Sequence, residues 1–247
     1  MFYICIDKIE PGIILHKLKM EIEIIAFDAD DTLWDNQSLF HEVEAKLCQL
    51  LGSYGEESYI SSVLNKIETE NMCRYGYGAK AFTLSLIETA LTVSKNQVSQ
   101  ICIAQIIEMG KYLLDMPIKL LDGVPETLAS LGKKYKLAIA AKGDLLDQQR
   151  KLGRSGLDGY FDYVGIVSDK NRIEYDRLAC RLRTKPSQIL MVSNSFGSDI
   201  STALSAGMYA AYIPHQTTWK REVNDEVADD ERLFRIDSFS QLCSLLE

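Results

Sequence analysis

The sequence has few histidines, and its cysteines are not grouped in the way that zinc sites and disulfide frameworks require. Only 3 histidines occur among 247 residues, and none has the spacing of a pair of metal ligands. The 6 cysteines are scattered along the chain and form no closely spaced pairs. We therefore expect no zinc site, and we expect reduced thiols and a cytoplasmic location.

Basic charge is also scarce. The chain has 27 Lys and Arg against 35 Asp and Glu, a formal net charge of -8, and no cluster of basic residues. Such a balance repels nucleic-acid backbones and anionic lipid, so we expect neither as a partner. We expect instead a small anionic ligand, which a metal ion or a few placed side chains would bind locally.

Long hydrophobic runs are absent from the start of the chain. The apolar patches of residues 1–20 are interrupted by Asp7, Lys8, Glu10 and Pro11. This pattern predicts neither a signal peptide nor a membrane span, and no function can be read from the segment. With 47% apolar residues, however, the chain can bury a full core, as one large domain or as a core with an insert.

Apolar patterning divides the rest of the chain into an interrupted α/β core. Residues 22–27 are apolar at nearly every position, which predicts a buried strand, whereas residues 37–114 show only helical periodicity, enough for about four helices. Strand and helix patterns alternate after Asp122, which predicts a parallel sheet covered on both faces. The further strands are expected at 137–141, 163–167, 189–192 and 209–213, and helices at 145–152, 173–182 and 199–206.

Two carboxylates lie directly after the first predicted strand, in Phe27-Asp28-Ala29-Asp30-Asp31-Thr32-Leu33. Taken alone, the segment also fits an ordinary acidic turn. As a catalytic motif, it offers Asp28 as a nucleophile that attacks phosphorus and Asp30 as an acid and then a base. Mg²⁺ would let the anionic carboxylate and phosphate approach each other, so we expect Mg²⁺ as the cofactor.

This motif, the helical insert and the later segments resemble the phosphatase branch of the haloacid dehalogenase-like hydrolases, from about residue 22 to the end. The resemblance implies a Rossmann-like core of residues 1–35 and 116–247, and an all-helical cap domain of residues 36–115. It assigns the nucleophile to Asp28, the general acid and base to Asp30, and a phosphate contact to Thr32. Asp30 favours phosphate chemistry, because the dehalogenase branch is expected to lack this second Asp.

Two later motifs of the family are matched with changes. Lys170 matches the lysine that neutralises charge at the site, although a solvated surface lysine remains the alternative. In the fourth motif Ser193 replaces a glycine and Asn194 replaces an acid, so we expect weaker metal binding. The positions that match the family's metal ligands are Asp28, Asp30, Asn194 and Asp199.

The second motif departs furthest from the family. It usually ends its strand with a hydroxyl residue that binds a phosphate oxygen, whereas this chain has Ala141-Lys142-Gly143. We expect phosphate to be bound there by backbone N–H groups of Lys142 and Gly143 and by the Lys142 side chain. The missing donor is expected to lower the rate, since one lost donor in a comparable role costs on the order of 10²–10³.

In the insert, the segment from Arg74 to Lys80 combines cations and aromatics in a glycine-containing turn. Arg74, Tyr77 and Lys80 are candidate substrate contacts, although packing between helices and solvated cations explain the pattern equally well.

The first hypothesis for function is a Mg²⁺-dependent phosphatase that hydrolyses a small phosphate ester through an aspartyl-phosphate. A phosphomutase acting on a sugar phosphate would use the same nucleophile but return the phosphoryl group to a bound sugar. A non-catalytic binding or regulatory protein of the same fold would bind phosphate without turnover. The identity of the substrate and the oligomeric state stay open.

Overall fold

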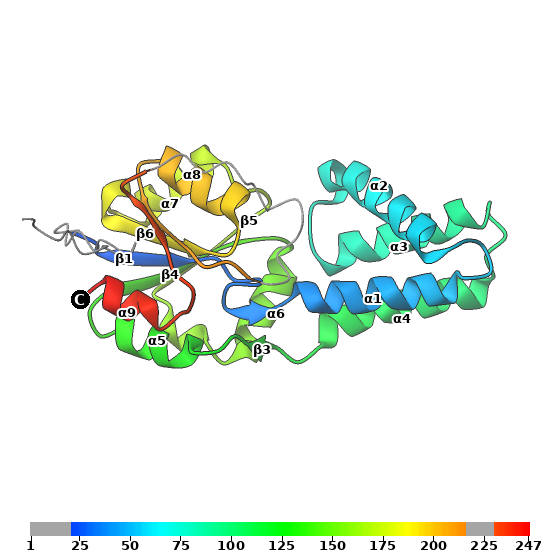
Figure 1. Ribbon diagram of the computed structural model, residues 1–247, viewed down its shortest axis with the longest axis horizontal. Coiled ribbons are helices and arrows are strands. Elements are labelled where there is room, and N and C mark those ends of the chain that lie inside the picture. Colours follow the sequence, from blue (N-terminus) through cyan, green and yellow to red (C-terminus); the bar gives the residue numbers. More distant parts are fainter. Residues whose placement is uncertain (1–20, 216–229) are drawn as a thin grey trace, which may run out of the picture.

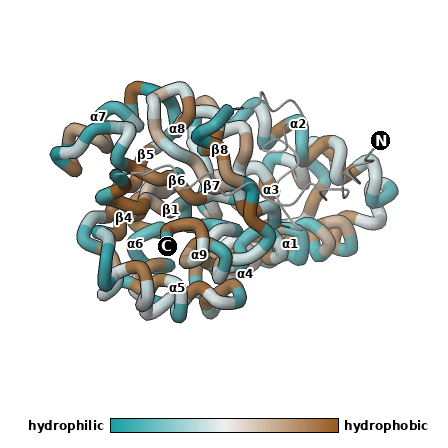
Figure 2. The backbone as a smooth tube through the Cα atoms, turned by 60° about the vertical axis from the view of Figure 1, so that its left-hand side comes forward, coloured by the Kyte–Doolittle hydropathy of each residue, from teal (hydrophilic) through white to brown (hydrophobic). Residues whose placement is uncertain are grey.

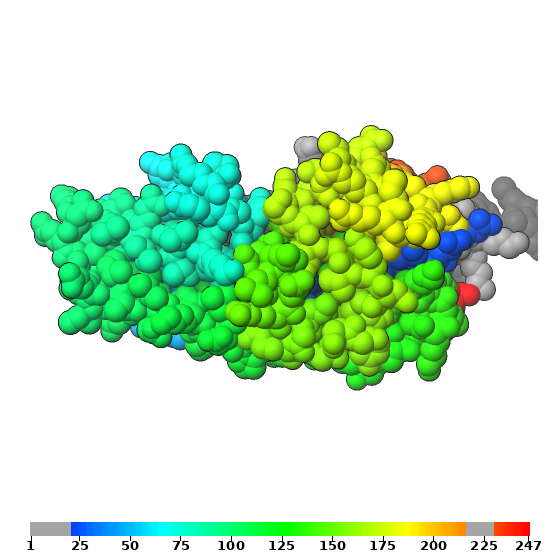
Figure 3. Space-filling model, turned by 180° about the vertical axis from the view of Figure 1, so that it is seen from behind, coloured from blue at the N-terminus to red at the C-terminus, as the bar shows by residue number. Residues whose placement is uncertain are grey.

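The computed structural model describes residues 21–215 and 230–247. The interrupted apolar segment of residues 1–20 lies outside the described residues. Within them the chain folds into two connected parts, an α/β core and an elongated helical bundle, which the space-filling view shows side by side (Figure 3). No helix in the described ranges is both long and apolar enough to cross a membrane.

The core is built on a six-stranded sheet whose paired strands are all parallel, in the order β5-β4-β1-β6-β7-β8. β1 is buried at all four positions, as its apolar run predicts. Figure 2 shows strongly apolar backbone along the central strands. The six strands are β1 (Ile24–Phe27), β4 (Lys136–Lys142), β5 (Tyr163–Val167), β6 (Ile189–Ser193), β7 (Tyr209–Tyr212) and β8 (Leu233–Arg235).

Alternate residues of β1 face opposite sides of the sheet, because side chains alternate along a strand. Ile25 and Phe27 pack in an apolar cluster with α5 and α9, whereas Ile24 and Ala26 pack with α7 and α8. Figure 1 shows these two helical layers on either side of the sheet. The predicted α/β core with helices on both faces is thus confirmed. Its helices are α5 (Val124–Leu131), α6 (Leu145–Ser155), α7 (Arg172–Leu182), α8 (Ser201–Ser205) and α9 (Gln241–Leu245).

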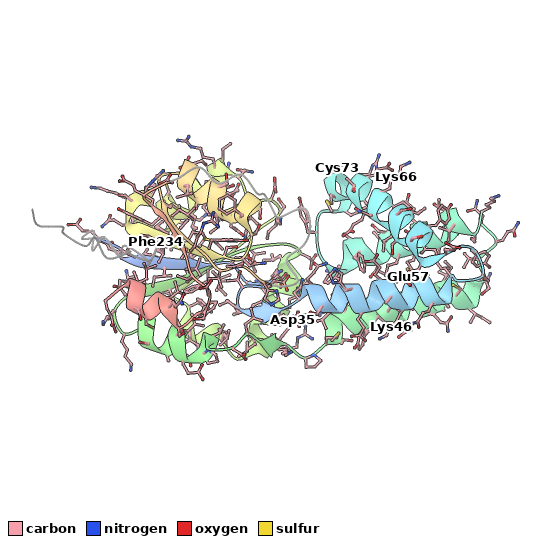
Figure 4. All side chains as sticks on the ribbon, in the orientation of Figure 1. Asp35, Lys46, Glu57, Lys66, Cys73 and Phe234 are labelled. Carbon is pink, nitrogen blue, oxygen red and sulfur yellow. The ribbon has the colours of Figure 1, made fainter. Side chains whose placement is uncertain are left out.

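The predicted helical insert follows β1. It forms a bundle with an apolar cluster of its own that includes Val43, Leu64, Leu86 and Ile106. The bundle extends from the end of the core where the chain leaves β1, and Asp35 lies at this junction (Figures 1 and 4). Assigning residues 36–115 to a separate cap domain stays a prediction. The four helices are α1 (Gln37–Leu50), α2 (Glu57–Tyr75), α3 (Ala79–Val93) and α4 (Gln100–Asp115).

Three features differ from the patterns of the sequence. The strands β2 (Trp34–Asp35) and β3 (Lys119–Leu120) form an antiparallel pair that is too short to leave a periodic signal. β8 extends the sheet beyond the last predicted strand. The helix expected from residue 199 is preceded by a π-helical turn, η3 (Phe196–Ile200), and α8 itself begins only at residue 201. Short or irregular elements depend on their tertiary neighbours more than on local pattern.

The helix α6 departs from the usual amphipathic arrangement, although its third leucine, Leu152, is buried. Its leucines Leu145 and Leu146 are 57% and 46% exposed. Its buried side chains include the polar residues Asp147, Gln148 and Lys151. Buried polar groups require hydrogen-bond or ionic partners. Gln148 and Lys151 both contact Asp30, just beyond the carboxyl end of β1, so this helix belongs to the description of the site.

Candidate active site

The carboxyl ends of β1, β4 and β6 meet at one edge of the sheet, because Phe27 is in register with Ile139 on β4 and Val192 on β6. Asp28 is the first residue beyond β1, and its backbone N–H donates to the carbonyl of Val192 at 3.0 Å. The Asp28 residue is only 8% exposed. Ligands of parallel α/β sheets usually bind at this edge.

Lys170 bridges two carboxylates at this edge. Its Nζ lies 2.5 Å from Asp28 Oδ1 and 2.7 Å from Asp199 Oδ1. Burial alone would lower the pKa of Lys170, but the neighbouring charges of Asp199 and Asp28 outweigh it and raise the pKa. The lysine is therefore a buried, charged group in contact with Asp28, and not a solvated surface side chain.

Besides Lys170, two hydroxyl groups contact the carboxylate of Asp199. The hydroxyl of Tyr175 donates to Asp199 Oδ1 at 2.5 Å, and the hydroxyl of Ser193 donates to Oδ2 at 2.8 Å. Asp199 lies on the π-helical turn η3 and is 1% exposed. Its carboxylate thus positions the ammonium of Lys170 from within the protein. Ser193, which replaces the glycine of the family motif, supplies one of these contacts.

Thr32 brings together side-chain oxygens of Asp28 and Asn194. Its Oγ1 lies 3.3 Å from Asp28 Oδ2 and 2.9 Å from Asn194 Oδ1, and it accepts the backbone N–H of Asn194 at 3.1 Å. The carboxylate oxygen of Asp28 and the amide oxygen of Asn194 are both hard ligands of the kind that Mg²⁺ prefers. Among the described residues, no three His, Cys, Asp or Glu side chains are grouped as metal ligands. Mg²⁺ often binds through one or two carboxylates, water and substrate phosphate, so this sparse set fits that ion.

Asp30 faces a different set of partners. Trp34 Nε1 donates to its Oδ1 at 2.7 Å, and Gln148 Nε2 donates to its Oδ2 at 2.7 Å. Lys151 of α6 contacts the same carboxylate. The Asp30 side chain nevertheless keeps 24% of its surface exposed. It is therefore both oriented by the protein and open to a ligand.

Asp31 shapes the turn that leads from β1 into the bundle. Its φ of 58° lies in the left-handed region, which Asp tolerates better than most residues. Its Oδ1 accepts the backbone N–H groups of Asn36 and Gln37, both at 2.9 Å. Burial raises its pKa from 3.8 to about 7, against the effect of these hydrogen bonds. The carboxyl group thus stabilises the start of α1.

The second motif offers no side-chain hydroxyl to a phosphate. Ala141 is 1% exposed and has no polar side-chain group. The backbone N–H of Gly143 donates to the carbonyl of Val167 at 3.0 Å, so it is used within the fold. Binding of phosphate by the backbone N–H groups of Lys142 and Gly143 stays a prediction. The Lys142 ammonium lies 4.3 Å from the centre of the Tyr77 ring, so its side chain contacts the helical insert.

Two of the three candidate contacts from the insert reach the core. Tyr77 packs against Lys142, and Lys80 Nζ lies 2.9 Å from Asp144 Oδ1. Arg74 is exposed, and its guanidinium donates to the backbone carbonyl of Glu70 in its own helix at 3.3 Å. The loop between α2 and α3 therefore lies over the segment that follows β4.

Sequence reasoning missed five residues that contact the predicted catalytic or metal-binding groups. Ser193 was noted only as a replacement, while Trp34, Tyr175 and the α6 pair Gln148 and Lys151 were not considered. A usable signal was present in α6, where polar residues recur at three- and four-residue intervals between two strands. For Tyr175, nothing in the local sequence distinguishes it from an ordinary core tyrosine.

The sheet topology and the cluster of carboxylates and lysine at its carboxyl edge define the class of the molecule, an α/β enzyme with an inserted helical bundle. A family model described as haloacid dehalogenase-like hydrolase matches residues 22–207. The chain belongs to this family.

Relatives of known name extend over almost the whole chain. The glyceraldehyde 3-phosphate phosphatase of Methanothermobacter thermautotrophicus is 26% identical over 239 residues, which cover 91% of this chain and 100% of that protein. The 5-amino-6-(5-phospho-D-ribitylamino)uracil phosphatase of Escherichia coli is 25% identical over 247 residues, covering 91% of this chain and 94% of the relative.

Solved structures show the same fold. A haloacid dehalogenase-like family hydrolase from Xanthomonas campestris is 30% identical, with a TM-score of 0.81 and coverage of 91% of this chain and 92% of that chain. The L-2-haloacid dehalogenase from Xanthobacter autotrophicus is 21% identical, with a TM-score of 0.66 and coverage of 91% and 98%. The second likeness concerns the fold alone.

Proposed function

We propose that the protein is a Mg²⁺-dependent phosphatase that hydrolyses a small phosphorylated metabolite with Asp28 as the nucleophile. The observation that carries this proposal is the 2.5 Å contact between Asp28 and the buried Lys170, with the partly exposed carboxylate of Asp30 two residues away. A carboxylate that must approach an anionic phosphate needs a fixed positive charge beside it, and Lys170 supplies that charge.

The reaction would proceed in two displacements. An Asp28 oxygen attacks phosphorus, the bond from phosphorus to the leaving oxygen breaks, and Asp30 gives the leaving oxygen a proton. Asp30 then takes a proton from water, whose oxygen attacks the aspartyl-phosphate and releases inorganic phosphate and free Asp28. Lys170 offsets negative charge on the transferred group in both steps.

Mg²⁺ would be held by side-chain oxygens of Asp28 and Asn194, and when bound it supplies further neutralisation of the phosphate charge. We assign the Asp30 carboxylate to proton transfer, because its side chain is partly exposed two residues from Asp28, and Asp199 to holding Lys170, because it is buried and contacts the ammonium directly. A set with one carboxylate has less negative charge than a set with two, so a modest affinity for Mg²⁺ is part of the proposal.

The substrate is proposed to be a small phosphate ester, selected beneath the loop between α2 and α3. Both curated relatives described above are named as phosphatases of small metabolites, glyceraldehyde 3-phosphate in one and a phosphorylated ribitylamino-uracil in the other. Lys80 and Tyr77 lie against the core beside Lys142, where they can contact the organic part of such an ester.

The 5 cysteines among the described residues are free thiols, which supports a reducing, cytoplasmic setting.

The test is hydrolysis of p-nitrophenyl phosphate by the purified protein, with Mg²⁺ and with EDTA. Asp28→Asn removes the nucleophilic charge, whereas Asp115→Asn makes the same change at an exposed position at the end of α4 and serves as the control. We expect turnover that requires Mg²⁺, is lost in Asp28→Asn and persists in Asp115→Asn. Binding of vanadate without any turnover by the wild type would contradict the proposal and favour a non-catalytic protein.

A further inference from the structure

The carboxylate of Asp30 is held by donors from two elements. Its Oδ1 accepts from Trp34 Nε1 at 2.7 Å and from Lys151 Nζ at 3.0 Å. Its Oδ2 accepts from Gln148 Nε2 at 2.7 Å and from Lys151 Nζ at 3.1 Å. Both oxygens therefore have a neutral and a charged donor, and rotation of the carboxylate would break several of these bonds at once.

Lys151 lies behind Asp30 and not in the open part of the site. Its side chain is 7% exposed, against 24% for Asp30. Besides Asp30 it donates to Asn36 Oδ1 at 2.7 Å, and it lies 3.8 Å from Asp147 Oδ2. A buried ammonium surrounded by these acceptors does not itself face a ligand. Its effect on any reaction must pass through Asp30.

Gln148 connects the same carboxylate to the strand that carries the second motif. Its Nε2 lies 2.7 Å from Asp30 Oδ2 and 3.3 Å from the backbone carbonyl of Lys142, at the end of β4. Gln148 and Lys151 are three residues apart on α6, so they face the same side of the helix. The polar buried face of α6 thus has a specific target, which a merely structural helix would not need.

We propose that Lys151 and Gln148 are positioning residues that orient the Asp30 carboxylate for proton transfer. This inference rests on the proposed function, in which Asp30 protonates the leaving oxygen. Proton transfer requires a donor held within hydrogen-bond reach of the leaving oxygen, so a freely rotating Asp30 would be a poorer acid. A basic leaving group depends on that acid more than a stable anion does.

The test compares kcat/KM for phenyl phosphate and p-nitrophenyl phosphate, two esters of similar size. The p-nitrophenolate leaves with little help from an acid, whereas phenolate needs more. The ratio of the two kcat/KM values therefore reports on acid assistance in the first displacement. Asp30→Asn removes this assistance completely, so its ratio is the largest change with which the other variants are compared.

We expect Lys151→Met to lower kcat/KM for phenyl phosphate about ten-fold more than for p-nitrophenyl phosphate, as part of the 10²–10⁴ that a general acid contributes. Gln148→Met should shift the ratio in the same direction by less, and Lys151→Arg should restore most of it. Arg150→Met, which removes a positive charge from an exposed position of the same helix, should leave the ratio unchanged. Combining Lys151→Met with Asp30→Asn should add no further change in the ratio.

Several results would overturn the inference. Equal losses on both esters in Lys151→Met and Gln148→Met would show a structural role only, and so would a further drop of the ratio in the double variant. If Lys151→Met does not fold, Gln148→Met and Lys151→Arg decide the question. A wild type that hydrolyses neither ester would overturn the proposed function itself, whereas an active wild type with an unchanged ratio in the variants overturns only the role of α6.

Discussion

The hydroxyl of Tyr175 donates a 2.5 Å hydrogen bond to the oxygen of Asp199 that also contacts Lys170. Tyr175 comes from α7, Asp199 from the π-helical turn after β6, and Lys170 from the segment before α7. π-helical turns are rare and often occur at functional sites. The chain of contacts from Tyr175 through Asp199 and Lys170 ends at Asp28 and fixes the proposed nucleophile.

Tyr175→Phe removes only the hydroxyl at the start of this chain of contacts. We expect the free energy of unfolding to fall by about 1.5–3 kcal/mol, the usual value of a hydrogen bond to a charged group. Activity should fall as well, because Asp199 is held less firmly. Urea denaturation and kcat measure the two effects. The control is Tyr112→Phe, whose hydroxyl contacts Glu42 on the surface and should change stability by less than about 0.5 kcal/mol. Equal effects in both variants would contradict the assignment.

Asn194→Asp returns a second acidic residue to the proposed metal site. We expect half-maximal activation at roughly ten-fold lower Mg²⁺, because added ligand charge raises the affinity for a hard cation. Calorimetric titration with Mg²⁺ measures the affinity independently of turnover. Asn96→Asp makes the same charge change at an exposed position after α3 and should leave the affinity for Mg²⁺ unaltered. An unchanged affinity in Asn194→Asp would argue that this side chain does not bind the metal.

Asp31 should make stability depend on pH between about 4 and 7. Its pKa is raised by burial from 3.8 to about 7 in the folded protein, so the folded state keeps a proton that the unfolded state has lost. The stronger proton binding of Asp31 in the folded state therefore stabilises the protein in full below pH 3.8, and this stabilisation is lost as the pH rises toward 7. The loss is on the order of 2–4 kcal/mol.

Asp31→Asn tests this dependence, since Asn keeps an oxygen for the N–H groups of Asn36 and Gln37 but does not titrate. In buffer containing EDTA, the variant should match the wild type near pH 4 and be more stable near pH 8. Asp122→Asn, at an exposed position, should show no such trend. A wild type and Asp31→Asn variant with parallel stability curves would refute the raised pKa.

Variants of Lys80 and Asp144 distinguish two roles for their ion pair. Either Lys80 binds substrate, or the pair holds the insert against the core. Both side chains are partly exposed, so the ion pair itself contributes roughly 0–1 kcal/mol. If Lys80 binds substrate as proposed, Lys80→Met should raise KM several-fold, whereas Asp144→Asn should leave KM unchanged or lower it by releasing Lys80. Lys111→Met, which breaks an exposed pair with Glu108, is the control. An equal rise of KM in both variants would show that the ion pair acts by holding the insert closed.

Local sequence was sufficient for most of the longer elements and for the first part of the site. The apolar run of residues 22–27 forms β1, and Asp28, Asp30 and Thr32 follow it within a few residues, so their proximity is a consequence of chain connectivity. The four helices of the insert formed where three- and four-residue periodicity predicted them, because each buries its apolar side against the others. Lys170 was found through its resemblance to the family's lysine position, which the strand before it and the helix after it supported.

The partners of these groups depended on the tertiary structure. Gln148 and Lys151 are 118 and 121 residues from Asp30 along the chain, and no local pattern connects them. At α6, Leu145 and Leu146 are exposed while Gln148 and Lys151 are buried, because the carboxylate of Asp30 is a partner for both polar side chains and stabilises their burial. The use of the Gly143 N–H within the sheet likewise depends on β5 lying beside β4. Residue order sets which groups can react, but the packing of distant elements decides how each one is oriented and charged.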